Sequence, residues 1–273
     1  TPVSNTYANR SHTYATAGDY NIKINGECSK FQYQSHPDRL LVKEILSWGI
    51  YSFDVINFNG CKNLIGGANC LDVINLNTTS ISQMFYDCEN MVSIQFMEDW
   101  DVSNITNFFG MFYDNNLFNQ DLTGWDTSSA TNIADLFRNA AIYNQPINSF
   151  DVSNSTSLRQ TFAAASNFNQ SLSSWDVSNV SNMEQMFRTS TSFNQDLSAW
   201  DLSSVTDMSN FMTNKSDANF SAANCDAIFE ACVNGGQSNV TLGMGTIKYS
   251  SAGATDRATL ISRGWTITDG GQV

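Results

Sequence analysis

Large aromatic residues recur every 25 positions through the middle of the chain. They are Trp100, Trp125, Phe150, Trp175 and Trp200. An Asp follows each of them, at Asp101, Asp126, Asp151, Asp176 and Asp201. An aromatic-Asn-Gln triplet begins at Phe118, Tyr143, Phe168 and Phe193. A further Phe keeps the same register at Phe112, Phe137, Phe162 and Phe187. Because several independent columns share one spacing, the sequence predicts a structural repeat of 25 residues.

The alternation of apolar and polar residues within one unit predicts its local structure. Trp200 and Leu202 alternate with Asp201 and Ser203, which predicts a short strand with its apolar side chains inward. The spacing resembles the L-x-x-L-x-L strand of leucine-rich repeats, with Trp in one Leu position. Residues 207–212 are expected to follow as a short helix or turn.

A unit of this size cannot bury both of its faces alone, so neighbouring units must stack. We therefore expect an α/β repeat, a right-handed solenoid of leucine-rich-repeat type with 25-residue coils and a parallel β face, capped at both ends. A degenerate F-x-x-C-x-N-[LM] motif at Phe58 and Phe85 extends the repeat upstream, so the solenoid is predicted over residues 50–217. Residues 28–49 are the predicted N-terminal cap and residues 218–273 the α/β C-terminal cap.

The two predicted caps contain their own elements. Residues 38–49 have the pattern of an amphipathic helix. The C-terminal cap is predicted to contain a helix over residues 221–233 that ends at Gly235-Gly236, a strand-like segment at 240–250, a helix at 254–263 and a strand at 265–267.

The charge and composition exclude several classes of function. The 273-residue chain carries 26 acidic against 13 basic residues, a net charge of -13. This balance argues against a nucleic-acid partner and against an anionic membrane surface, which both select clustered Lys and Arg. No apolar run approaches the ~20 residues of a membrane span, so we expect no direct membrane insertion. With only two histidines in the chain, His12 and His36, we expect no catalytic function.

The segment Trp175–Met183, W-D-V-S-N-V-S-N-M, is followed by M-F and F-N-Q. It resembles the repeat of BspA-like leucine-rich-repeat surface proteins, a group that includes mycoplasma surface lipoproteins, bacterial and protist adhesins, and proteins of marine phages. The resemblance covers about residues 50–217 and implies a surface-exposed, non-catalytic recognition or adhesion module. It assigns no ligand and no binding residues. Residues 12–20 resemble the end of a PKD-type β-sandwich, so residues 1–27 are expected to close an upstream β-sandwich-like module of a larger chain or fibre.

The Asp column and the Ser column two positions further on form the predicted binding surface. The Ser residues are Ser103, Ser128, Ser153, Ser178 and Ser203. Carboxylates one strand spacing apart repel by about 1 kcal/mol per neighbouring pair in water, so something must offset this repulsion. We expect each Asp to cap the following turn through backbone N–H groups. A row of Ca²⁺ sites is the alternative, although one carboxylate per coil supplies few oxygens for that ion.

Small hydroxyl groups beside carboxylates suit polyhydroxyl ligands or a basic protein surface. A merely solvated surface is the alternative for the same face. The aromatic column is expected to lie in the core, and the Asn-Gln column is expected to bond the coils to each other along the stack.

The six cysteines do not predict a metal site, because no C-x-x-C pair occurs. Cys225 and Cys232 would lie ~10 Å apart on a helix, too far for a disulfide. Cys61 and Cys88 occupy equivalent positions in successive units and could bridge or stack as buried thiols. Buried free thiols are favoured.

Together these features predict an extracellular adhesion or receptor-recognition module on a cell or virion surface, such as a phage fibre tip. Its partner would be a glycan or protein of a host or neighbouring cell, with no resident cofactor. The alternative is a structural subunit of a surface layer or filament. Ordered polymers would favour the second interpretation, and saturable binding to a defined partner the first.

Overall fold

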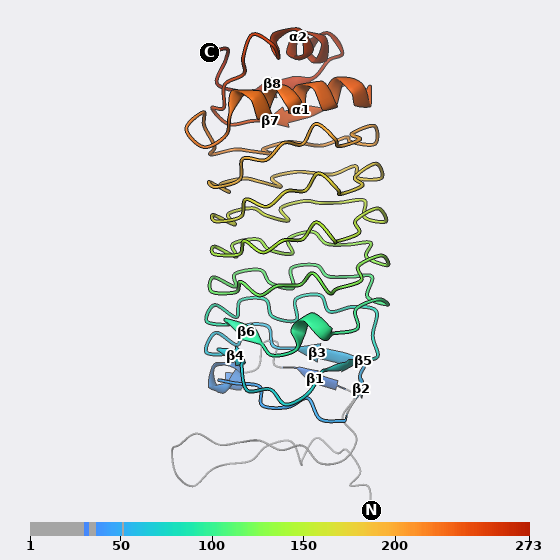
Figure 1. Cartoon of the computed structure of the whole chain (residues 1–273), viewed down its shortest axis with the longest axis vertical. Helices are drawn as coiled ribbons and strands as arrows, with labels where there is room; N and C mark the ends of the chain where they lie inside the picture. The colour runs from blue at the N-terminus through green and yellow to red at the C-terminus, as the bar shows by residue number, and fades with distance from the viewer. Residues whose placement is uncertain (1–29, 33–36, 51) are drawn as a thin grey trace, which may run out of the picture.

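The described chain is a tall stack of flat coils that follow one another along the long axis of the molecule (Figure 1). The computed structural model describes residues 30–32, 37–50 and 52–273. Most of the backbone is irregular, and the regular elements are short. They are β1 (Lys30–Gln32), the 3-10 helix η2 (Pro37–Leu41), β2 (Ser52–Phe53), β3 (Val55–Asn57), β4 (Gly66–Gly67), β5 (Asn75–Leu76), β6 (Ser93–Ile94), the 3-10 helix η3 (Met97–Asp99), α1 (Ala222–Gly235), β7 (Thr241–Gly243), α2 (Ala254–Ser262) and β8 (Thr266–Thr268). The module predicted for residues 1–27 lies outside the described residues, as does Cys28.

Each sheet in the described part of the chain is a pair of parallel strands. The pairs are β1 with β3, β2 with β5, β4 with β6, and β7 with β8. In the middle of the stack the parallel pairing shrinks to single bridges, such as Asn107 to Asn132 and Asn182 to Asp207. The parallel pairing that the repeat predicts is therefore confirmed, but there it is too short to make strands.

Backbone hydrogen bonds between successive coils hold the stack together. The N–H of Phe108 donates to the carbonyl of Asn132 at 2.8 Å, and the N–H of Gly110 to that of Ala134 at 3.0 Å. Two positions in this part of each coil have positive φ, such as Gly110 (57°) and Asp114 (58°). A positive φ at the third residue of a four-residue turn is typical of type II turns. Consecutive turns therefore form this part of the coil, and every second backbone N–H donates a hydrogen bond to the next coil.

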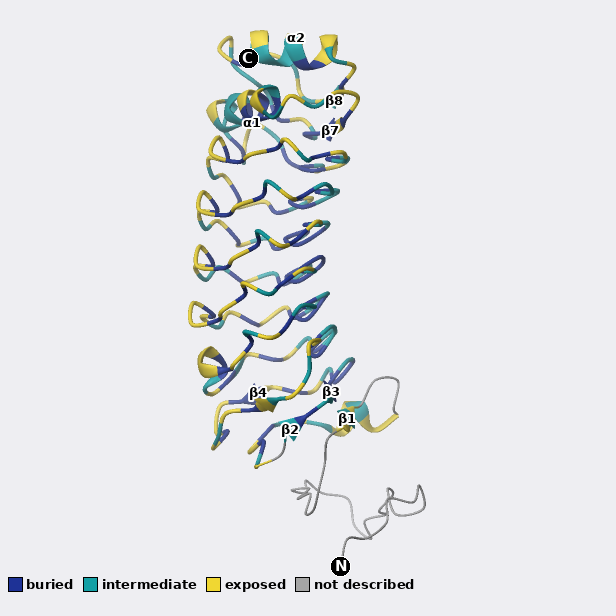
Figure 2. Ribbon diagram, turned by 90° about the vertical axis from the view of Figure 1, so that its right-hand side faces the viewer, coloured by how far each residue is buried: buried dark blue, intermediate teal, exposed yellow. Residues whose placement is uncertain are grey.

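Aromatic rings stack through the core from coil to coil. The ring centroids of Phe137 and Phe162 lie 5.9 Å apart, and those of Phe162 and Phe187 lie 5.7 Å apart, with nearly parallel planes. Trp100 and Trp125 stack at 6.3 Å. Buried positions fill the interior of every coil, and exposed positions gather at the corners (Figure 2). The inward orientation predicted for the Trp column is confirmed.

The strand predicted at Trp200–Leu202 and its equivalents is wrong: no strand occurs between Ile94 and Thr241 in the described chain. The reason is local. In each coil the segment after the aromatic residue closes into a turn, as where the N–H of Ile105 donates to the carbonyl of Val102 at 2.9 Å. The alternation of inward and outward side chains is real, but it comes from a corner of the coil. Of the two alternatives predicted for residues 207–212, a short helix or a turn, the structure shows a turn.

The amphipathic helix predicted over residues 38–49 is also wrong. The 3-10 helix η2 covers its beginning, and the chain then extends and joins the stack. The N–H of Ile45 donates to the carbonyl of Gly66, and the N–H of Ile65 donates to that of Lys43, both at 2.8 Å. These bonds to the next coil use backbone groups that a helix would need for itself.

The C-terminal elements match their predictions. α1 is N-capped by the Ser221 side chain, which accepts from the N–H of Asn224, and its last residue is followed by Gly236 at φ 78°. The strand β7 lies in the segment predicted as strand-like, and α2 and β8 follow in the expected order.

The Asn-Gln column bonds each coil to the next, as predicted. Asn144 Oδ1 accepts the N–H of Asn169 at 2.9 Å, and Gln170 Nε2 donates to the Asn144 carbonyl at 3.0 Å. At the end of the column Asn194 Oδ1 accepts the N–H of Ser221, which lies at the start of α1. The amide ladder thus continues into the C-terminal helix.

The five described cysteines are buried and free, as the sequence favours. Cys61 and Cys88 are unbridged, and burial raises the pKa of Cys61 to about 12. Among the described residues, no helix is long and apolar enough to cross a membrane.

Candidate functional site

Each Asp of the predicted binding surface caps a turn, as expected from the sequence. In all five coils Oδ1 of the Asp accepts the backbone N–H of the Ser two residues further on. The five distances are 3.1 Å for Asp101–Ser103, 3.0 Å for Asp126–Ser128, 2.9 Å for Asp151–Ser153, 3.0 Å for Asp176–Ser178 and 2.9 Å for Asp201–Ser203. All five Asp residues are exposed at the corners of the coils.

These hydrogen bonds lower the pKa of three of the carboxyls. Ser103 donates to Asp101 Oδ1 from its hydroxyl at 2.6 Å and from its N–H, and this lowers the pKa of Asp101 against the smaller opposing effects of desolvation and of the Asp126 charge. Hydrogen bonding by the Ser two residues on likewise lowers the pKa of Asp126 and Asp176. The structure therefore pairs each Asp with the Ser of its own coil and keeps these three carboxylates ionised at neutral pH. Whether the row binds a partner stays a prediction.

A metal site is not assembled in the described part of the chain. No group of three His, Cys, Asp or Glu side chains lies close enough there to hold an ion. The carboxylates of the Asp row come from five different coils, and each is committed to its own turn through Oδ1.

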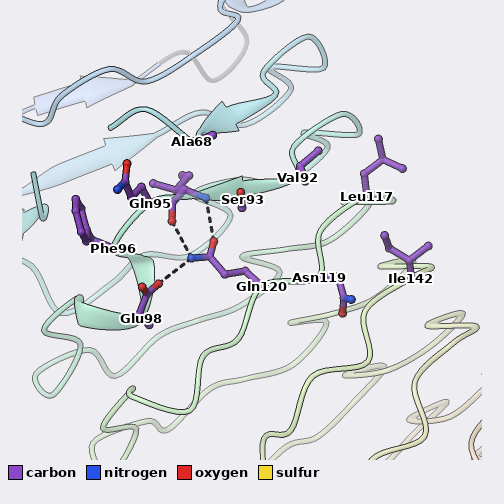
Figure 3. A pocket seen from close by; sticks show the side chains of 11 residues that line it. Ala68, Val92, Ser93, Gln95, Phe96, Glu98, Leu117, Asn119, Gln120 and Ile142 are labelled. Carbon is purple, nitrogen blue, oxygen red and sulfur yellow. Dashed lines mark hydrogen bonds between the residues drawn. The ribbon is translucent and has the colours of Figure 1, made fainter. Parts of the chain in front are cut away.

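A groove that the sequence did not predict lies beside β6. It is an open hollow with a volume of about 540 Å³, lined by Ala68, Val92, Ser93, Ile94, Gln95, Phe96, Glu98, Leu117, Asn119, Gln120 and Ile142. Figure 3 shows Val92, Leu117 and Ile142 on one side of the hollow and Phe96 and Glu98 on the other. The groove therefore has an apolar side and a side that carries a carboxylate.

The side chain of Gln120 holds the middle of the groove in place. Its Oε1 accepts the N–H of Ile94 at 2.9 Å, and its Nε2 donates to the Ile94 carbonyl at 2.8 Å (Figure 3). The same Nε2 donates to Glu98 Oε2 at 3.0 Å. The amide thus pairs with β6 as a strand residue would, which closes the edge of β6 and fixes the position of Glu98.

The groove arises because the repeat changes length at this point. Nine positions separate Met91 from Trp100, whereas seven separate the equivalent residues Phe118 and Trp125. The two extra residues fall between 92 and 99, where Phe96 adopts a left-handed φ of 63° and η3 follows. The inserted segment supplies the floor and one side of the groove. This spacing change is the signal in the sequence that could have located the site.

Exposed aliphatic side chains are the second signal. Leu117 is 42% exposed and Ile142 38% exposed, and they occupy equivalent positions in successive coils. The equivalent residues of the coils on either side are polar: Asn63, Asn90, Asn167 and Ser192. This position varies along the repeat, so it is not one of the regular columns from which the sequence predicts sites.

Comparison with known proteins places the chain in a family. Residues 56–163 and 124–226 match the family model described as Mycoplasma protein of unknown function, DUF285. The two matches overlap and together cover more than half of the chain, as a repeated sequence would. No curated protein and no solved structure matches the chain significantly. The chain therefore belongs to the family described as Mycoplasma protein of unknown function, DUF285.

Proposed function

We propose that this protein is an extracellular recognition or adhesion module on a cell or virion surface. In this proposal the stack is a right-handed solenoid of the BspA-like leucine-rich-repeat type, and it presents its Asp-Ser corners to a glycan or a basic protein surface of another cell. The family match and the coil stacking are consistent with a repeat scaffold of this kind. The chemistry has no catalytic step, because the carboxylates form a line rather than a convergent pair.

The observation that carries the proposal is the repeated geometry of the Asp row. Every Asp accepts its turn hydrogen bond at Oδ1, so the turn occupies one carboxylate oxygen of the two. Since the corners stack, the row offers fixed, exposed acceptors at the spacing of the coils. Fixed acceptors bind polyhydroxyl or cationic groups with little loss of conformational freedom.

The test uses variants that keep the turn but remove the charge. The triple variant Asp126→Asn, Asp151→Asn and Asp176→Asn retains an oxygen that accepts the same N–H. We expect the wild-type chain to bind a subset of a glycan array or of intact cells saturably, and the triple variant to lose at least about 10-fold in apparent affinity. Repeating the assay with Ca²⁺ and with EDTA shows whether a cation bridges the contact.

Asp121→Asn with Asp196→Asn is the matched control. These two exposed residues cap a different corner, with Oδ1 accepting the N–H of Thr123 at 2.9 Å and of Ser198 at 2.8 Å. Unchanged binding by the triple variant would exclude the Asp row. Ordered filaments or layers in electron micrographs, without saturable binding, would instead support a structural subunit.

A further inference from the structure

The groove beside β6 combines a row of aliphatic side chains with a fixed carboxylate. Val92 is 51% exposed, and together with Leu117 and Ile142 it lines one side of the hollow (Figure 3). The three residues come from three successive coils. Leu117 and Ile142 occupy equivalent positions in neighbouring coils, ~4.8 Å apart, and Val92 lies in the preceding coil, two residues beyond the equivalent position. Exposed aliphatic groups that share one hollow offer apolar surface that a partner can bury.

Glu98 is the one charged residue among those that line the groove. It is exposed, and no Lys or Arg is among the lining residues. The exposed Asp99 and Asp121 directly follow lining residues in the sequence, and the whole chain has a net charge of -13. A cationic partner is therefore attracted to this place, and an anionic one is repelled.

The groove is also rigid before any partner arrives. Gln120 bonds both backbone groups of Ile94 and holds Glu98, so neither the floor nor the carboxylate has to be ordered on binding. A preformed site loses less entropy when it binds. The closed edge of β6 means that a partner would be held through side chains rather than as an added strand.

We propose that this groove binds an extended peptide segment of a partner protein that carries aliphatic side chains next to Lys or Arg. The aliphatic groups pack on Val92, Leu117 and Ile142, and the cation pairs with Glu98. A glycan fits less well, because five of the eleven lining residues are aliphatic, and the lining offers one hydroxyl, on Ser93, and one half-buried aromatic ring, on Phe96. This site is separate from the Asp-Ser corners, so it stands whether or not those corners bind.

The experiment measures fluorescence anisotropy of a fluorescein-labelled heptapeptide of alternating Lys and Leu with the full chain. We expect saturable binding with Kd below about 1 mM, weakened by salt. The double variant Leu117→Ser and Ile142→Asn should bind about 10-fold more weakly. Glu98→Gln should bind about 3-fold more weakly and lose part of the salt dependence, while keeping an oxygen for Gln120.

The substitutions are chosen so that folding is preserved. Ser and Asn already occupy the equivalent positions at Ser192 and Asn167 in the next two coils. Ile261→Asn, at a 47% exposed residue of α2, is the matched control and should leave binding unchanged. The proposal is overturned if the Lys-Leu peptide does not bind, if a Glu-Leu peptide binds equally well, or if the double variant binds like the wild type.

Discussion

Lys215 is a cation buried in the stack, and no carboxylate of the described residues pairs with it. Its side chain is 1% exposed, and Nζ donates to the carbonyls of Ser190 at 2.6 Å and Phe193 at 2.7 Å. The Phe220 ring lies 5.7 Å away. Burial lowers the pKa of Lys215 to about 8, because the two carbonyls replace only part of the lost hydration.

This lowered pKa predicts a pH dependence of stability. An unfolded Lys has a pKa of about 10.4, so between about pH 8 and 10 the unfolded chain binds a proton that the folded chain has released. Unfolding then takes up a proton, and the contribution of Lys215 to stability rises with pH through this window, by at most about 1.4 kcal/mol per pH unit. Below pH 8 both states are protonated and the contribution is constant.

The measurement is urea unfolding of the wild type and of Lys215→Met at pH 7.5, 9 and 10. The buried thiols lower stability as pH rises, since burial raises the pKa of Cys225 to about 12. Both proteins contain these thiols, so the informative quantity is the difference between their free energies of unfolding. We expect the free energy of unfolding of the wild type to increase relative to that of the variant as pH rises. A difference that stays constant with pH would contradict the assignment.

At the scale of the element, the second of the two positive-φ positions in each coil is a repeated site of backbone strain. It is occupied in successive coils by Asp87, Asp114, Asn139, Ala164, Thr189 and Asn214, all at φ between 57° and 69°. Asn adopts this left-handed conformation more readily than other residues with a Cβ. Asn139 also donates to Asp114 Oδ1 at 2.6 Å. Ala164 has neither the preference of Asn for this conformation nor an amide, so it interrupts the side-chain hydrogen bonds between coils at this position.

We expect Ala164→Asn to stabilise the protein by about 0.5–1 kcal/mol, because it relieves strain and supplies an amide that reaches Asn139 in the preceding coil. Thermal unfolding checks the direction. Ala164→Gly separates the two causes: it removes the strain but adds no amide and makes the unfolded chain more flexible. A lower midpoint for Ala164→Asn than for the wild type would show that the turn excludes the larger side chain.

The elements that could be predicted from the sequence are those set by local patterns. The α1 helix has its apolar positions and its terminal glycine within one segment, and the aromatic column from Trp100 to Trp200 recurs every 25 residues. The strand at Trp200–Leu202 could not be distinguished from a turn, because both place alternate side chains inward. The hydrogen bond from the Ser203 N–H to Asp201 Oδ1 shows that this segment is a turn.

The groove was harder to predict because it depends on contacts between coils. The longer spacing from Met91 to Trp100 marks where the repeat is interrupted, but not the direction in which the extra residues lie. That direction is set by the left-handed Phe96 and by the pairing of Gln120 with Ile94, 26 residues away. The sequence pattern gives the register of a repeat. The conformation of a segment that departs from the repeat depends on contacts with the neighbouring coil.

For the whole molecule, a stack of coils is stable only where each coil has a neighbour. The last repeated coil is covered by β7: the N–H of Met208 donates to the carbonyl of Thr241 at 3.0 Å, and that of Met212 donates to the carbonyl of Gly243 at 2.7 Å. Leu242 is fully buried there. Stability in such arrays is close to a sum over nearest-neighbour contacts, so the loss of an end should act locally.

Deleting residues 218–273 should therefore uncover the core at Phe211 and Met212, which are fully buried in the complete chain. We expect increased binding of an apolar dye, a lower thermal midpoint and fast hydrogen exchange over residues 200–217. Exchange near Phe162, two coils further in, should stay slow because its neighbours are unchanged. Equal protection at residues 200–217 with and without the deleted segment would show that the coils need no cap. Loss of protection throughout would show that the stack unfolds as one unit.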